Sequence, residues 1–254
     1  MFNLFKIEFY KLRKSKMFYL LIFLTIMQAI VVYSVSADSS SKNLRLMSGK
    51  DTLVYMLFIQ EQLAINIIAG VLAADYIVTE FTSGYIKNLV SYGHKRTSIF
   101  ISKSMIYYMG IIIISFIVPV IMTVINTITN GYGEVFTFNS LIFLIKIFLL
   151  TIIIKMAIGS ISVLSAFVSK NVNVTISVVV AIDFINRIIN VMFINKSLTV
   201  IKWICNIIVL NQYSIVLQDK AGTSEFLQAG IVSLITILVT TIAGICIFKK
   251  SDIK

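Results

Sequence analysis

The chain has 254 residues, of which 58% are apolar and 13% are charged, whereas a soluble domain carries about 25% charged residues. So little polar sequence excludes an ordinary cytosolic enzyme, and so much apolar sequence excludes a disordered chain, which leaves a polytopic membrane protein. The formal net charge of +11 has the sign that nucleic acid attracts, but cytoplasmic loops of membrane proteins also collect Lys and Arg, so we expect no nucleic-acid partner.

The thickness of the bilayer limits the number of helices. A spanning helix needs about 20 apolar residues, so the chain can hold roughly six or seven of them. The apolar runs are continuous, whereas the strands of a membrane β-barrel alternate apolar and polar residues over about 10 positions. We therefore predict an all-α polytopic membrane protein with one transmembrane domain over residues 1–254.

Residues 1–16 are predicted to form an amphipathic helix on the inner membrane surface. Basic residues surround an apolar stripe at helical spacing, which consists of Phe2, Phe5, Phe9 and Leu12. The alternative is the basic start of a signal peptide, because the apolar run 17–35 ends in small residues that resemble a cleavage site. That run is longer than the roughly 7–15 residues of a signal peptide, so we expect it to remain as the first span.

Five further spans are predicted along the chain, which makes six. They cover residues 53–74, 104–128, 141–168, 172–193 and 226–248. The third of the six contains Pro119, which should kink it. The stretch 195–224 before the last span is semi-apolar and external, and we expect one or two short helices in the outer leaflet there.

The distribution of basic residues predicts the orientation. Of the 22 Lys and Arg residues, 13 fall in segments on one side of the membrane and six in segments on the other. Because cytoplasmic segments are the richer in Lys and Arg, both termini and the segment 75–103 are predicted to be cytoplasmic. The chain would then be a multi-pass protein of a bacterial plasma membrane.

The predicted spans contain four ionisable residues that are hypotheses for function, Glu61, Lys155, Asp183 and Arg187. Asp183 and Arg187 are four residues apart and share one helix face, which favours a local ion pair. Lys155 lies roughly 20 Å from the outer end of its span, with Glu61 or Asp183 as its possible partner. The alternative is that these groups line a subunit interface or a polar path.

The segment 75–103 resembles the cytoplasmic loop of ABC-2-type transporter permeases. That family has a Glu, a small residue before Gly, a Lys, an apolar pair, an Arg and a Lys in this order after its second span. The matching residues are Glu80, Ser83, Gly84, Lys87, Leu89, Val90, Arg96 and Lys103. Tyr85 and Gly93 stand where the family often has Thr and Pro. Residues 8–16 also resemble the opening helix of the family, and the small size and composition resemble its lantibiotic and bacteriocin immunity permeases.

The resemblance implies that a separate ATPase subunit docks on this segment. The docking residues would be Glu80, Ser83, Gly84, Tyr85, Lys87, Leu89 and Arg96. The residues themselves support docking, because a short helix can seat apolar side chains in the groove of a partner while charges set its orientation. The apolar side chains expected there are Phe81, Tyr85, Ile86 and Leu89. The alternative is a solvated loop without a partner.

No G-x-x-x-x-G-K-[ST] phosphate-binding loop occurs in the sequence, so ATP and Mg²⁺ would be used by the partner subunit. We expect no cofactor, metal or catalytic residue in this chain. The resemblance implies a dimer of identical or related permease chains that exports an amphiphilic substrate, such as an antimicrobial peptide. The alternatives are a non-transporting immunity or sensor protein and an intramembrane enzyme, which is disfavoured because HExxH and GxSxG motifs are missing.

Overall fold

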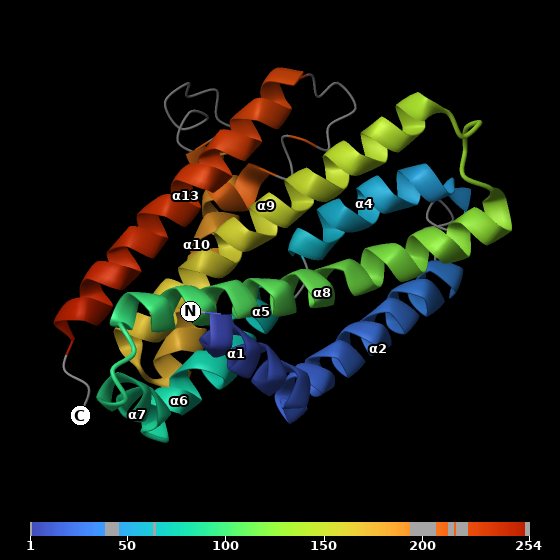
Figure 1. The fold of residues 1–254 in the computed structure, drawn as a ribbon. Coiled ribbons are helices and arrows are strands. Elements are labelled where there is room, and N and C mark those ends of the chain that lie inside the picture. Colours follow the sequence, from blue (N-terminus) through green and yellow to red (C-terminus); the bar gives the residue numbers. More distant parts are fainter. Residues whose placement is uncertain are drawn as a thin grey trace.

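A computed structural model describes residues 2–38, 46–62, 65–193, 207–212, 216 and 223–251. These residues form helices and short connections, without a β-strand among them. Six of the helices are long and apolar enough to cross a membrane, which confirms an all-α polytopic membrane protein. Figure 1 shows a bundle of long helices in which the first helix and the end of the last helix lie toward the short helices α6 (Thr79–Thr82) and α7 (Tyr85–Ser91).

The first span, α2 (Lys16–Asp38), is preceded by the short helix α1 (Phe2–Lys14). The two helices meet at an angle (Figure 1), and the Ser15 Oγ between them accepts a hydrogen bond from the Phe18 amide at 3.2 Å. The helix over residues 1–16 is thus confirmed, but the predicted apolar stripe is divided, because Phe5 and Leu12 pack on the core whereas Phe9 points outward. The inward face of α1 carries Leu4, Glu8 and Leu12, which are at most 3% exposed, and Phe9 is 46% exposed.

The second span is broken and longer than predicted. Instead of one helix over 53–74, the chain forms α4 (Gly49–Gln62) and α5 (Ile65–Ala73) in series. The π-helical turn η1 (Ala74–Val78) and α6 continue the second piece to Thr82. At 1.5 Å per residue the two pieces measure about 21 and 27 Å, which together nearly match the ~52 Å of α8 (Arg96–Asn130) beside them.

The predicted loop 75–103 is therefore mostly helical. Its first part completes the second span, α7 fills its middle, and the third span α8 begins at Arg96 rather than at residue 104. The predicted boundary failed because Asp75, Glu80 and Lys103 are polar enough to suggest a loop from the sequence. Their side chains have partners elsewhere in the fold that no local pattern reveals.

The last three spans agree with the prediction to within a few residues. They are α9 (Phe138–Ser169), α10 (Val172–Phe193) and α13 (Thr223–Lys250). Of the external stretch 195–224, the structure describes residues 207–212, 216 and 223–224, including the 3₁₀ turn η2 (Val209–Asn211), which contacts α9 and α13. The rest of that stretch lies outside the described residues, so the predicted outer-leaflet helices stay a prediction.

Residues 46–50 and 131–134 meet at the end of the bundle away from α6 and α7. The Gly49 amide donates to the Gly131 carbonyl at 3.0 Å, and Lys50 Nζ lies 2.7 Å from Glu134 Oε2. Hydrogen bonds from Lys50 and Ser140 hold the pKa of Glu134 below its usual range. These contacts fix the start of α4 to the connection between α8 and α9.

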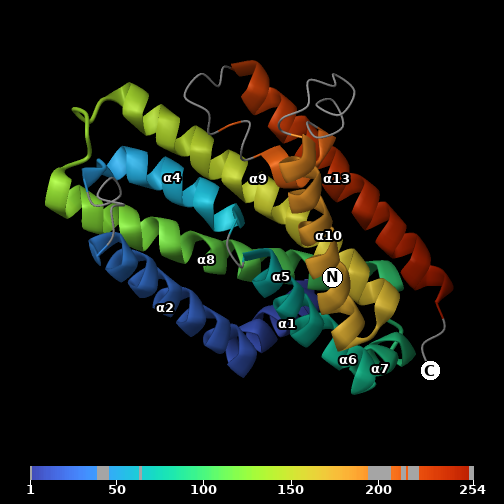
Figure 2. The same cartoon turned by 180° about the vertical axis from the view of Figure 1, so that it is seen from behind.

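The largest buried cluster lies at the opposite end, near both termini. It joins apolar side chains of α1, α2, α5, α7, α8, α9 and α13. Rings of Phe81, Phe100, Phe167 and Phe248 pack together there at centroid distances of 4.5–5.9 Å. Figure 2 shows the same end from behind, with α6 and α7 at the lower right of the bundle. The helices that carry the predicted docking residues are therefore anchored on a rigid core.

Candidate functional site

A tight turn sets the angle between α6 and α7. Gly84 adopts a φ of +74°, and a Cβ added there would meet nothing within 4 Å. The glycine is thus required by its left-handed backbone and not by lack of space. A second glycine with positive φ, Gly93 at +84°, ends α7, where the His94 amide donates to the Leu89 carbonyl at 3.1 Å. The Ser83–Gly84 pair read from the sequence therefore makes a turn that presents α7.

The apolar side of α7 faces the protein itself. Ile86 is fully buried and Leu89 is 6% exposed, both within the large core cluster. The Phe81 ring packs edge-on against Phe167 and Phe248, at 5.5 and 5.9 Å. Ile86 and Leu89 therefore belong to the protein's own core and cannot fill the groove of a partner as predicted, whereas Phe81 and Tyr85 are only partly buried.

The surface that α6 and α7 leave exposed is polar and basic. Tyr92, at the end of α7, is 83% exposed and is the one large ring on it. We call this surface the docking face, and it comprises Ser83, Lys87, Asn88, Tyr92, His94 and Lys95. Lys87 and Ser83 were predicted as docking residues. Tyr92 was not, although an aromatic residue between two glycine-containing turns was a signal available in the sequence.

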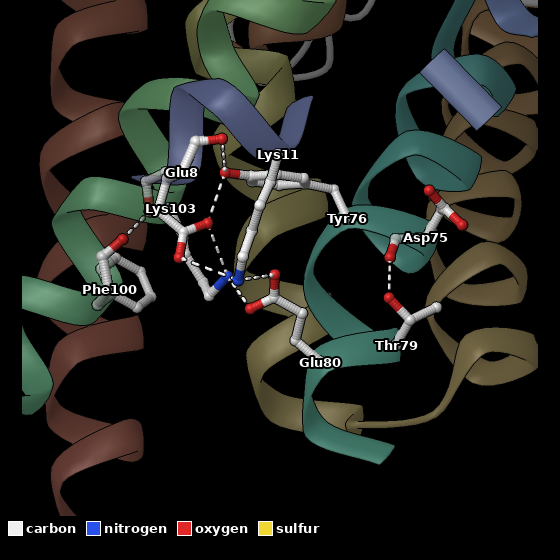
Figure 3. Close-up of polar contacts among 9 residues, drawn as sticks. Glu8, Lys11, Asp75, Tyr76, Thr79, Glu80, Phe100 and Lys103 are labelled. Atoms are coloured by element: carbon white, nitrogen blue, oxygen red, sulfur yellow. Dashed lines mark hydrogen bonds and ion pairs between the residues drawn. The ribbon is translucent and has the colours of Figure 1, made fainter. Parts of the chain in front are cut away.

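Four charged side chains and a tyrosine meet beneath the docking face (Figure 3). Lys103 Nζ lies 3.0 Å from Glu8 Oε2 and also contacts Glu80, while Lys11 Nζ lies 2.9 Å from Glu80 Oε1. The Tyr76 hydroxyl donates to Glu8 Oε2 at 2.7 Å. We call Glu8, Lys11, Tyr76, Glu80 and Lys103 the charge cluster. The side chains of Glu8 and Lys103 are fully buried.

The charge cluster joins three elements that are far apart in sequence. Glu8 and Lys11 come from α1, Tyr76 and Glu80 from the end of the second span, and Lys103 from α8. Buried charges are tolerated only when they are paired, and here two acids face two lysines. Glu80, predicted to contact a partner, is instead a partner of Lys11 and Lys103.

Tyr85 and Arg96, two further predicted docking residues, also have internal contacts. The Lys11 ammonium lies 3.0 Å from the centre of the Tyr85 ring, a cation–π contact. The Arg96 guanidinium donates to the carbonyls of Phe248, Lys249 and Ser251 at 2.9, 2.8 and 2.7 Å. Arg96 thereby caps the C-terminal end of α13 and ties it to the start of α8.

A second group of polar residues lies inside the membrane-spanning region. Arg187 Nε is 2.6 Å from Asp183 Oδ2, as the spacing predicted. The Asn66 amide donates to the other Asp183 oxygen at 2.6 Å, a contact between α5 and α10 that sequence spacing could not reveal. A small pocket of about 10 Å³ adjoins this group, and Ser162 of α9 lines it with Asn66 and Asp183.

The other two predicted intramembrane groups are less fully defined. Lys155 of α9 is 2% exposed, and its pairing with Glu61 or Asp183 stays a prediction. Glu61 belongs to α4, and its side chain lies outside the described part of the chain. Among the described residues, no group of three His, Cys, Asp or Glu side chains is placed to hold a metal ion.

The chain matches a family of known proteins. The model of a family described as ABC-2 family transporter protein matches residues 4–190, from α1 into α10. That range contains the docking face, the charge cluster and the Asp183–Arg187 pair. No curated protein matches the chain significantly.

Proposed function

The chain belongs to the ABC-2 family of transporter proteins and is a membrane permease subunit of an ATP-binding cassette transporter, and on that premise we propose that its docking face receives a separate ATPase subunit. The observation that carries this proposal is the shape of the segment after the second span. Two short helices stand at the end of the bundle, their apolar side held by the core and their polar side exposed.

The chemistry of the docking face suits a protein partner. An exposed tyrosine flanked by basic side chains combines a large contact area with charge that can steer association. Lys87 and Lys95 flank Tyr92 in sequence and are exposed with it. We therefore expect an acidic groove on the ATPase subunit, with Tyr92 as the anchor.

The charge cluster would transmit movement of the docking face to the helices that cross the membrane. Glu80 lies one turn before the Ser83–Gly84 turn, and Lys103 lies two turns into α8. A force on α7 would reach α1 and α8 through these paired charges, because a buried ion pair resists separation. On this proposal, the ATPase moves α1, α7 and α8 together.

The transported substrate is proposed from the resemblance of the chain to bacteriocin immunity permeases. We propose export of an amphiphilic molecule such as an antimicrobial peptide, by a dimer of this chain with an identical or related permease. ATP and Mg²⁺ would be bound by the ATPase subunits. The Asn66–Asp183–Arg187 group places polar side chains within an apolar region, which is the kind of contact that the polar part of an amphiphilic substrate would need.

The test is reconstitution with a candidate ATP-binding cassette ATPase subunit. We expect the two proteins to purify together from detergent and, in vesicles, to move a fluorescent amphiphilic peptide only when ATP is present. Tyr92→Ala and Lys87→Glu should weaken association and reduce transport together. Val135→Ala, at an 84% exposed position at the other end of the bundle, is the matched control and should change neither.

Two results would contradict the proposal. One is a complex that forms equally well with Tyr92→Ala and Lys87→Glu. The other is an ATPase that never purifies with the chain, combined with unchanged function of a Glu80→Lys variant. The second result would favour the non-transporting immunity or sensor protein.

A further inference from the structure

The outward side of α1 is a surface that does not belong to the docking face proposed for the ATPase. Its inward side, with Leu4, Glu8 and Leu12, is buried. Its outward side exposes apolar and basic residues together: Lys6, Ile7, Phe9, Tyr10, Arg13 and Lys14. Phe9 is 46% and Tyr10 is 61% exposed. A helix surface that mixes bulky apolar residues with Lys and Arg is typical of binding to the interface of an anionic membrane.

The position of α1 in the chain places this surface at the level of the lipid headgroups. Lys14 ends α1 and Lys16 begins the first span, with Ser15 alone between the two helices. Arg13, Lys14 and Lys16 therefore lie within about one helical turn of the start of the span. All three are exposed.

We propose that the exposed face of α1, with Arg13, Lys14 and Lys16, binds the anionic headgroups of membrane phospholipids. Basic residues beside the start of a transmembrane helix attract anionic lipids, and each strengthens binding about fivefold. The charge of this face and its position in the chain both indicate that its ligand is an anionic lipid. The face is positive, it lies where the first span enters the membrane, and its apolar residues can enter the boundary of the acyl chains.

Lipid binding at this face would also act on the charge cluster. Glu8 and Lys11, on the inward side of the same helix, contact Lys103 and Glu80. Lipid headgroups bound to the outward side of α1 would hold the helix in position, and this would stabilise the contacts of Glu8 and Lys11 on its inward side. The consequence for transport rests on the proposed function, whereas the binding itself does not.

The experiment uses the purified, delipidated permease in neutral detergent, without an ATPase. Native mass spectrometry counts bound lipid during titration with phosphatidylglycerol or with phosphatidylcholine of the same acyl chains. We expect the wild-type chain to prefer phosphatidylglycerol at least tenfold. The triple variant Arg13→Gln, Lys14→Gln, Lys16→Gln should bind phosphatidylglycerol about a hundredfold more weakly, and 0.5 M salt should weaken wild-type binding in the same direction.

Two further variants keep the result specific. Lys14→Arg with Lys16→Arg retains the charges and should retain the preference. The double variant Lys249→Gln, Lys250→Gln removes exposed basic residues at the same end of the bundle. It should keep most of the preference for phosphatidylglycerol. Equal affinity of the wild-type chain for both lipids overturns the proposal whether or not the variants fold. The proposal is also overturned if the Lys249 and Lys250 variant loses as much affinity for phosphatidylglycerol as the Arg13, Lys14 and Lys16 variant. Because no ATPase is present, either failure leaves the proposed ATPase docking intact.

Discussion

Lys103 connects two acidic side chains from different helices at the end of the bundle that holds α6 and α7. Its ammonium contacts two carboxylates, and the side chains of Lys103 and Glu8 are fully buried. The sequence contained both residues within segments that resemble the family, but they are 95 positions apart. Spacing along one helix can predict a pair such as Asp183 and Arg187, whereas a pair between α1 and α8 requires the tertiary fold. The cluster was therefore missed although each of its residues was visible.

We predict that Lys103→Met lowers the free energy of unfolding by about 3–5 kcal/mol, because it leaves the buried Glu8 carboxylate with only the more distant Lys11 ammonium, 3.9 Å away. Unfolding by denaturant in mixed micelles measures this. Adding Glu8→Gln should recover much of the loss, since both buried charges are then gone. Lys95→Met, at an exposed position, is the control. A Lys103→Met variant as stable as Lys95→Met would show that the charge cluster does not hold α1 to α8.

Arg96 illustrates how a residue in a recognised motif can have a structural role. The prediction assigned it to docking, and the structure places its guanidinium on three carbonyls at the end of α13. Arg96→Gln should loosen the last turn of α13, so that trypsin cleaves after Lys249 and Lys250 several-fold faster. The cleavage rate of Arg96→Lys should lie between those of the wild type and Arg96→Gln, because an ammonium lacks the planar, forked set of donors of a guanidinium. Equal cleavage of wild type and Arg96→Gln would contradict the capping role.

Among the elements, α6 and α7 show most clearly what the sequence could and could not predict. The Ser83–Gly84 pair predicts a turn, and φ of +74° at Gly84 confirms why glycine is needed. Which side of α7 faces outward could not be predicted. A half-apolar helix looks the same whether a partner or its own chain covers it, and here Ile86 and Leu89 are covered by the chain itself.

The packing of α13 on α8 depends on one glycine. A Cβ at Gly244 would lie 2.5 Å from the Phe100 ring, which is itself buried. We predict that Gly244→Ala destabilises the protein by about 1–3 kcal/mol through overpacking. Gly230→Ala, in the same helix with nothing within 4 Å, is the matched control and should be neutral or slightly stabilising, since Ala favours helix over Gly. Thermal unfolding in detergent would compare them, and equal midpoints would refute the close contact.

At the scale of the whole molecule, most of the architecture follows from apolar length alone. The run 141–168 is long and uninterrupted, and α9 covers it with a few residues to spare. The second span departs from this rule. It consists of two described helices, α4 and α5, and it continues past Asp75 and Glu80 because the second of these acids is paired with lysines. Hydropathy scores a charged residue in the same way whether or not it is paired, so the predicted span ended too early.

The orientation predicted from basic residues can be tested with cysteines in a variant without Cys205 and Cys246. Tyr92→Cys and Val135→Cys are exposed at opposite ends of the bundle. A membrane-impermeant maleimide should label Val135→Cys in intact cells and Tyr92→Cys only after the membrane is opened. The reverse pattern would place both termini outside the cell.

The central claim is that an ATPase subunit docks on the face around Tyr92. A photo-crosslinking amino acid at position 92, introduced in living cells, tests it most directly, with the same amino acid at Phe136 as the control, since Phe136 is 60% exposed in the connection between α8 and α9. We predict a covalent adduct from position 92 that mass spectrometry identifies as an ATP-binding cassette ATPase, and none from position 136. An ATPase adduct of equal yield from both positions, or from neither, would contradict the account.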